Sequence, residues 1–268
     1  MNKEQAETLS KDALDQLATE LEAGRSKRLT DYLATMARFP NYSLGNVILI
    51  ASQRPDATIV AGFHAWKKLG RFVMKGEKGI AIVAPIVGRK ELENDESAVR
   101  GFRIVHVFAY ESTDGEPLPQ LAKIGGDPGE ATARLRRLIK DKGIDLCYVD
   151  ELPGALGRSR GGKIEILTTL TPAQEFEVLA HELGHEMLHK RDGVESMPSR
   201  DVRELEAEAV AYASCIGIGL DAKASSIDYI GLFQGSKEML VQSLDRIQKV
   251  ASEILREVTA TAHVDTAA

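Results

Sequence analysis

The sequence feature that most constrains the fold is a complete set of helix-start signals at Thr171. Threonine is a favoured N-cap residue, Pro172 stands at the first helical position, and Gln174 completes a capping box. The helix follows closely on Lys163–Leu167, a short run with the alternation of a strand. A strand followed by a well-capped helix predicts that this half of the chain combines sheet and helix.

Ten residues into the predicted helix the sequence reads His-Glu-Leu-Gly-His, from His181 to His185. Residues four apart lie on one helical face, so both imidazoles can bind one ion, while Glu182 lies about 100° around the helix. A catalytic zinc ion uses three protein ligands and lowers the pKa of a bound water to about 7. The motif predicts a Zn²⁺ site, or a site for another divalent metal, with Glu182 as the catalytic base of a peptidase.

The third ligand has to come from another element, and two glutamates one helical turn apart are candidates. Glu204 and Glu208 share a face of a predicted helix, while Glu206 points away from it. We expect Glu208 to be the ligand, because the apolar run Ala209–Ile218 buries that end of the helix, and Glu204 to orient a histidine ring by a hydrogen bond. His189 continues the histidine row, but at ~12 Å along the axis from the first histidine it is too far to share the ion.

A basic stretch lies within an acidic chain. The whole chain has a net charge of −6, whereas residues 38–90 carry nine basic and two acidic residues, which leaves −13 for the rest. Aromatic residues are interleaved with these cations, as in proteins that hold single-stranded nucleic acid by stacking and phosphate contacts. The alternatives are a solvated basic face and, for Trp66, a core position. The residues predicted to bind DNA are Arg38, Tyr42, Trp66, Lys67, Lys68, Arg71, Lys75 and Lys78.

The order of the patterns predicts an α+β protein of two domains. A segment rich in Gly, Pro and Asp, Thr113–Gly129, has no apolar periodicity and is predicted to link them. We expect a small α/β domain at residues 1–120 and a helix-rich domain carrying the histidines at 130–260. No apolar run reaches the ~20 residues of a membrane span, and the two cysteines lie in apolar stretches, so we expect a cytoplasmic protein without a membrane partner. Strands are predicted at Thr58–Val60, Arg71–Met74, Ile80–Pro85, Arg103–Phe108, Ile144–Val149 and Lys163–Leu167, the last as an exposed edge strand that could pair with a peptide.

Several motifs make the chain similar to one known family. Tyr42–Asn46, Ala61–Gly70 and Lys75–Gly79 resemble segments of the N-terminal domain of the ArdC antirestriction family, and Thr113–Pro119 resembles the end of that domain. The second half, with its His-Glu-Leu-Gly-His motif and the Glu-Ala-Val-Ala-Tyr-Ala run from Glu208, resembles the metallopeptidase domain of the same family, which is related to zincins of the ImmA/IrrE type. The resemblance also selects Glu208 as the third ligand.

The resemblance implies a domain that binds single-stranded DNA, joined to a zincin-like metallopeptidase domain. It also implies an antirestriction role on mobile elements such as conjugative plasmids, protecting incoming single-stranded DNA. Two alternatives stay open. The chain could be a regulatory zinc protease, of a repressor-cleaving or DNA–protein-repair type, whose N-terminal domain docks a protein substrate. It could also be a DNA-binding protein without enzymatic activity, whose metal is structural.

Overall fold

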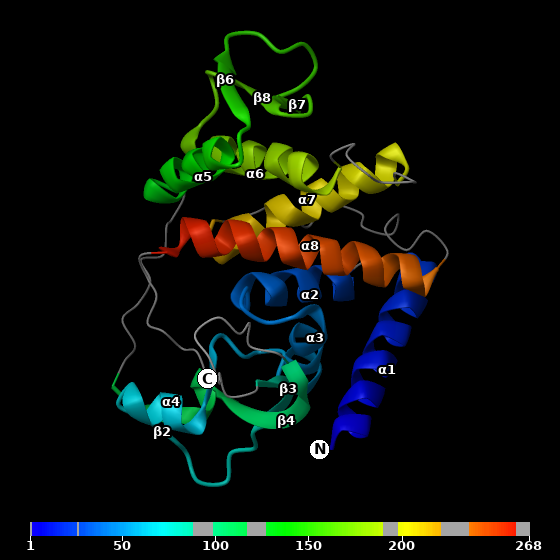
Figure 1. Cartoon of the computed structure of the whole chain (residues 1–268), viewed down its shortest axis with the longest axis vertical. Coiled ribbons are helices and arrows are strands. Elements are labelled where there is room, and N and C mark those ends of the chain that lie inside the picture. The colour runs from blue at the N-terminus through cyan, green and yellow to red at the C-terminus, as the bar shows by residue number, and fades with distance from the viewer. Residues whose placement is uncertain are drawn as a thin grey trace. The chain divides into compact units, whose positions relative to one another are not determined.

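The computed structural model describes residues 2–25, 27–87, 99–116, 127–189, 198–220 and 236–260 (Figure 1). The contacts within the chain divide it into two compact units of unequal size. Unit 1 comprises Met1–Asp15, Gly45–Pro119 and Asp265–Ala268, and unit 2 comprises Gln16–Leu44 and Gln120–Val264. The first helix, α1 (Lys3–Glu22), contributes residues to both. From the sequence we expect two domains that follow one another, at residues 1–120 and 130–260, whereas each unit combines segments that are separated along the chain.

Unit 1 is built on a three-stranded antiparallel sheet with the order β1-β4-β3. Its strands are β1 (Val60–Gly62), β3 (Ile80–Val87) and β4 (Val99–Ala109), and a second small sheet pairs β2 (Arg71–Val73) with β5 (Thr113–Gly115). Two short helices, α4 (Phe63–Lys68) and the 3-10 helix η1 (Tyr110–Ser112), connect these strands.

The outer edge of β3 is covered by helix α3 (Leu44–Gln53). The side-chain amide of Asn46 donates to the Val83 carbonyl at 2.8 Å and accepts from the Val83 N–H at 2.8 Å. Gln53, two turns later, makes the same pair of bonds with Ala81, at 2.9 and 3.0 Å. Because an unpaired edge offers a row of free backbone groups, these amides act in the place of a further strand.

Apart from the end of α1, the described part of unit 2 holds five helices and one small sheet, arranged in layers (Figure 1). The sheet lies against α5 and α6, and α7, α8 and α2 follow on the other side of α6. The helices are α2 (Lys27–Arg38), α5 (Glu130–Asp141), α6 (Pro172–Leu188), α7 (Arg200–Gly217) and α8 (Lys237–Val258). Ala37, Ala213 and Ala251 form a buried cluster from α2, α7 and α8, so small side chains allow these three helices to pack closely.

The start of α6 is as predicted. The Thr171 side chain accepts a hydrogen bond from the Gln174 backbone, and the Gln174 side chain accepts one from the Thr171 backbone, which is the reciprocal capping box. Helix α8 buries an apolar face that runs from Leu240 to Leu255.

The sheet of unit 2 differs from the expectation in one respect that affects the site. Its order is β6-β8-β7, with β6 at Asp145–Val149, β8 at Lys163–Leu167 and β7 at Gly157–Ser159. Lys163–Leu167 was predicted as the exposed edge strand, but it is the central strand, because residues 157–159 turn back and pair with it. The edge strand on that side is therefore β7.

The acidic segment at residues 91–97 and residues 117–126 of the expected linker lie outside the described residues. None of the helices in the part of the chain that the structure describes is long and apolar enough to cross a membrane.

Candidate metal centre and candidate nucleic-acid face

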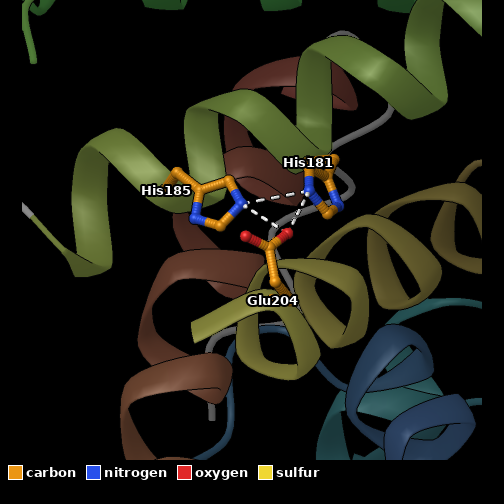
Figure 2. A group of neighbouring side chains, drawn as sticks. All are labelled: His181, His185 and Glu204. Carbon is orange, nitrogen blue, oxygen red and sulfur yellow. Dashed lines mark hydrogen bonds and ion pairs between the residues drawn. The ribbon is translucent and has the colours of Figure 1, made fainter. Parts of the chain in front are cut away.

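Helices α6 and α7 bring two histidines and one glutamate together (Figure 2). The Nε2 atoms of His181 and His185 lie 3.1 Å apart, and the Oε2 atom of Glu204 lies 3.7 Å from the first and 3.4 Å from the second. Among the described residues this is the group of side chains whose ligand atoms converge within 4.8 Å. The arrangement supplies two imidazole nitrogens and one carboxylate oxygen, a common donor set for a divalent transition metal.

Glu208 contacts the same histidine from its other side. Its Oε2 atom lies 3.0 Å from Nδ1 of His181, the nitrogen that faces away from the convergence point. The structure thus gives Glu204 the place expected for Glu208, and gives Glu208 the ring-orienting place expected for Glu204. The burial of one end of α7 does not determine which of two residues one turn apart reaches the histidines.

The stagger of α6 against α7 determines where the side chains of Glu204 and Glu208 meet the histidines. Gly184 lies between the two histidines, and a Cβ atom there would stand 3.3 Å from Cα of Ala207, so the helices approach closely at this point. Ala207 lies between Glu204 and Glu208 on α7. Close contact at this pair of small residues sets the level at which each glutamate side chain reaches α6.

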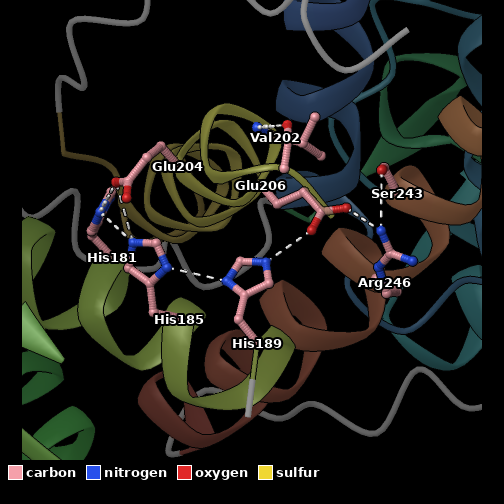
Figure 3. A network of polar contacts seen from close by, with 9 residues as sticks. His181, His185, His189, Val202, Glu204, Glu206, Ser243 and Arg246 are labelled. Carbon is pink, nitrogen blue, oxygen red and sulfur yellow. Dashed lines mark hydrogen bonds and ion pairs between the residues drawn. The ribbon is translucent and has the colours of Figure 1, made fainter. Parts of the chain in front are cut away.

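A chain of polar contacts continues from the cluster into the core of unit 2 (Figure 3). Nδ1 of His185 lies 3.1 Å from Nδ1 of His189, and Nε2 of His189 lies 2.9 Å from Oε2 of Glu206. The other oxygen of Glu206 accepts a hydrogen bond from Arg246 on α8. Glu206 does point away from the face of Glu204 and Glu208, as expected, but this direction leads into the core and not to solvent, and its side chain is fully buried.

Burial and neighbouring charges shift the pKa values of these groups in different directions. Burial raises the pKa of Glu182 to about 6, and the charges of Glu204 and Glu186 add to this against the opposite effect of His181. Burial and the charge of His181 lower the pKa of His185 to about 4. Burial alone would lower the pKa of His181, but its bond to Glu208 and the surrounding carboxylates raise it above the ordinary value. His185 is therefore neutral at neutral pH, and the pKa of Glu182 lies about one unit below neutral pH.

The cluster opens into a cleft of about 1310 Å³ that is bordered by the edge strand β7. Glu182 lies directly under this strand, since a Cβ atom on Gly157 would stand 2.9 Å from its Cγ and Oε1 atoms. Glu186 fixes the turn after β7, accepting hydrogen bonds from the Ser159 hydroxyl and from the Gly161 and Gly162 N–H groups, the last two at 2.8 and 2.7 Å. The cleft therefore brings the buried Glu182 carboxyl, the edge strand β7 and the cluster of His181, His185 and Glu204 beside one another.

In unit 1, two of the residues predicted to bind DNA belong to the core. Trp66 is fully buried, and its indole N–H donates to the Phe108 carbonyl at 2.8 Å. Arg71 is 5% exposed and ties β2 to β5. Its guanidinium donates to the Thr113 side chain and carbonyl and to the carbonyls of Gly115 and Glu116, and it lies 4.1 Å from the centre of the Tyr110 ring. For both residues the expectation of a DNA contact is wrong in this structure, because no face of either side chain is open to a base or a phosphate.

The other predicted DNA residues divide between the two units. Lys67, Lys68, Lys75 and Lys78 are exposed in unit 1. Arg38 and Tyr42 lie in unit 2, where Arg38 donates to Thr35 at 3.0 Å and burial raises the pKa of the half-buried Tyr42. The lysines therefore remain the candidates for phosphate contacts.

Three exposed phenylalanines lie on the surface of unit 1. Phe63, Phe72 and Phe102 are 53%, 58% and 55% exposed. The Phe63 ring lies 6.3 Å from that of Phe108. Phe102 was not among the expected residues, although the alternation Phe102, Ile104, His106, Phe108 along β4 marks one face of a strand and could have indicated it. These exposed rings and the exposed lysines of unit 1 are the candidate nucleic-acid contacts.

Comparison with known proteins bears on both units. Residues 7–110 match the family model described as the N-terminal domain of anti-restriction factor ArdC. The crystal structures of antirestriction ArdC protein from the R388 plasmid, one metal-free and one Mn(II)-bound, match 95% of this chain and 99% of their own, with TM-scores of 0.55 and 0.53 at 21% and 22% identity. An uncharacterized protein of Bacillus anthracis is 25% identical over 309 residues, which is 96% of this chain and 52% of that protein. The chain thus has the mixed α/β fold of the R388 structures and spans about half the length of this curated relative.

Proposed function

Residues 7–110 match the N-terminal domain of anti-restriction factor ArdC, and from this premise we propose that the chain is an ArdC-type antirestriction protein in which unit 2 is a metal-dependent peptidase and unit 1 binds single-stranded DNA. The observation that carries the first part is the convergence of His181, His185 and Glu204 beside the buried Glu182. The second part is supported by the exposed phenylalanine rings and the exposed lysines that unit 1 carries.

The donor set fits a divalent metal ion. His181 gives the hydrogen on Nδ1 to the carboxylate of Glu208, which leaves a lone pair on Nε2. That lone pair faces Nε2 of His185 at 3.1 Å and the Glu204 carboxylate at 3.7 Å. Electron-rich atoms placed so closely repel one another unless a cation lies among them, so we assign His181, His185 and Glu204 as the ligands. Zn²⁺ and Mn²⁺ are both candidates; a Mn(II)-bound structure exists for the R388 protein.

The residues of this chain have separate roles in the proposed reaction. When bound, a divalent ion would lower the pKa of a ligated water to about 7. Glu182, with its pKa near 6, accepts a proton at neutral pH and can return it to the leaving amine. Strand β7 is an edge strand that borders the cleft, so an extended peptide paired with it would run past Glu182.

The metal site is tested by calorimetric titration of Mn²⁺ and Zn²⁺ into the full, metal-free chain. We expect Glu204→Gln to abolish binding and Glu208→Gln to weaken it about 10–100-fold, as for residues that orient a ligand. The reverse order would restore Glu208 as the ligand. Glu182→Gln should bind metal normally and fail to cleave unfolded casein or a fluorogenic peptide library; cleavage by this variant would refute the assigned base.

DNA binding is tested by fluorescence anisotropy of a labelled single-stranded oligonucleotide with the full chain. Each stacked base contributes ~1–3 kcal/mol, so Phe63→Ala and Phe102→Ala should each weaken binding about 5–150-fold. Tyr148→Ala removes an exposed ring from unit 2 and is the matched control. Binding should also fall steeply with salt, because the lysines release counterions from phosphates. Salt-independent binding of a protein partner, with no DNA binding at low salt, would favour a regulatory protease with a docking domain.

A further inference from the structure

We propose that Arg200 and Arg203 form a subsite for a carboxylate side chain, so that the cleft takes peptides with Asp or Glu within about three residues of the bond to be cleaved. This subsite rests on the peptidase function proposed above and defines the class of its substrate. Two kinds of observation support it, namely the position of the two arginines in the cleft and the partners that the charged groups of the cleft have within the chain.

Both arginines belong to the wall of the cleft that α7 forms. Arg200, Glu204 and Glu208 follow one another at four-residue intervals and therefore share one face of this helix. Arg203 directly precedes Glu204, which faces the two histidines of α6 (Figure 2). An anion at Arg200 would lie one helical turn, or ~6 Å along the axis, from Glu204. Because an extended peptide advances ~3.3 Å per residue, this distance corresponds to about two peptide residues.

The guanidinium groups of both arginines lack a carboxylate partner among the described residues. Arg203 is half-buried, and its Nε atom is enclosed with no hydrogen-bond partner in the described chain. Arg200 is exposed, and within the described ranges no ion pair joins it to an acid. Arginine stays charged and has only donors, and an enclosed donor without an acceptor is costly. Both side chains therefore favour an acceptor that comes from outside the chain.

The acidic side chains of the cleft are already engaged. They are Glu177, Glu182, Glu186, Glu204 and Glu208. Each has a hydrogen bond, an ion pair or an electrostatic interaction within the chain. Among the described contacts, none of these interactions is an ion pair with an arginine of α7. The cleft thus combines engaged carboxylates with a pair of cations that have no internal counterion.

The arginines of the β7 segment differ from this pair. Gly157 and Ser159 contact α6, so Arg158 between them points to the other face of the sheet. There it is the register partner of Glu165 on the central strand. Arg160 also turns to this glutamate, with its Nε atom 3.4 Å from Oε2. The pair on α7 therefore remains as the cationic part of the cleft without a counterion in the described chain.

A single carboxylate fits this charge pattern better than a strand of nucleic acid does. A guanidinium group matches the two oxygens of a carboxylate in a bidentate geometry. A nucleic acid strand carries one phosphate per nucleotide, so phosphates next to the one on Arg200 would lie beside Glu204 and Glu208, one and two turns further along α7. A peptide can place one acidic side chain on the arginines and uncharged groups along the rest of the cleft.

The first test is cleavage of a random peptide library by the full chain with Mn²⁺, with the cut positions identified by mass spectrometry. We expect Asp and Glu to be enriched at one position within about three residues of the cut. A peptide with Glu at that position should have a kcat/KM about 10-fold above that of its Gln counterpart, chiefly through KM. Cleavage without a charge preference, or with a preference for Lys or Arg, would overturn the subsite.

Variants test whether the arginines cause the preference. In Arg200→Gln/Arg203→Gln the ratio of kcat/KM for the Glu and Gln peptides should fall from about 10 to about 1. The single change Arg200→Glu, at the exposed position, should shift the preference to a Lys peptide, an outcome that a folding defect does not produce. Arg137→Gln, at an exposed arginine of α5, is the matched control and should keep the ratio. An unchanged ratio in the Arg200→Glu variant would refute the subsite, even if the double variant fails to fold.

A binding assay separates failure of the subsite from failure of the proposed peptidase. Fluorescence anisotropy of the full chain in EDTA compares labelled pools of short random peptides that carry Glu, Gln or Lys at a fixed central position. We expect the Glu pool to bind about 10-fold more tightly than the Gln pool, with a difference that Arg200→Glu reverses, since the lysines of unit 1 attract any anion.

If the wild type cleaves no peptide, the peptidase function is refuted and this binding assay decides the subsite. Equal binding of the pools, or a difference that does not depend on Arg200, would then refute it. Arg200-dependent binding of a labelled single-stranded oligonucleotide, without a preference among the peptide pools, would assign the arginines to phosphate and overturn the proposal.

Discussion

Replacement of Glu182 by glutamine should stabilise the metal-free protein at neutral pH, although it removes the proposed base. The Glu182 side chain is buried, with 7% exposure, and its pKa is raised from 4.5 to about 6, chiefly because burial disfavours the charged form. A shift of about 1.5 units corresponds to ~2 kcal/mol at 1.36 kcal/mol per unit. The carboxyl group therefore holds its proton more tightly in the folded than in the unfolded chain, and ionising it costs stability.

The sign of this effect sets its pH dependence. Below pH 4.5 the carboxyl is protonated in both states and carries no penalty; the penalty grows between about pH 4.5 and 6 and is complete above that range. Glutamine does not ionise, so the variant should be more stable than the wild type by up to ~2 kcal/mol at pH 8 and by little at pH 4.5. For a chain of this length the gain corresponds to a Tm difference of ~4–8 °C at pH 8.

The assay is thermal unfolding of both proteins in EDTA at each pH. Comparing the two proteins at the same pH cancels the titration of all other groups. With saturating Mn²⁺ the gain should shrink, because a nearby cation offsets the buried carboxylate charge. An equal gain at pH 4.5 and pH 8, or no gain at either, would refute the reasoning that Glu182 is a destabilised buried carboxylate.

Three further outcomes are expected. Gly157→Ala should abolish peptide cleavage and cost ~1–3 kcal/mol of stability, since its Cβ would stand 2.4 Å from Cγ1 of Val178; full activity in a cleavage assay would show that β7 can move away. Trp66→Phe should lower stability by ~1–3 kcal/mol in urea unfolding, because it leaves the Phe108 carbonyl without its donor, and a loss of DNA affinity without loss of stability would contradict a core role. Metal at 100 times its Kd should raise the free energy of unfolding by ~2.7 kcal/mol, and Tm values unaffected by EDTA or added Mn²⁺ would argue against a site in the folded state.

The sequence was most informative where the signal lies within one element. The capping box at Thr171 depends only on residues a few positions apart and is found as predicted. The spacing of His181 and His185 likewise fixes their common face. Such features follow from helical geometry alone.

Features that depend on how two elements pack against each other could not be predicted from the sequence. Periodicity places Glu204 and Glu208 on one face, but the contact of Gly184 with Ala207 determines their level relative to the histidines. The role of Arg71 could not be predicted for a similar reason. A cation in a basic stretch can bind a phosphate or several carbonyl oxygens, and the carbonyls that Arg71 binds come from residues more than 40 positions away.

The packing of α2 against α7 and α8 has a consequence for the synthesis of the chain. Leu29, Leu33 and Met36 on α2 are buried in the finished protein, and besides α1 the helices that pack against α2 include α7 and α8, which begin at Arg200 and Lys237. At ~5–20 residues per second, α2 leaves the ribosome about 10–30 s before α7 does. The apolar face of α2 must remain uncovered, or be shielded by a chaperone, during that interval.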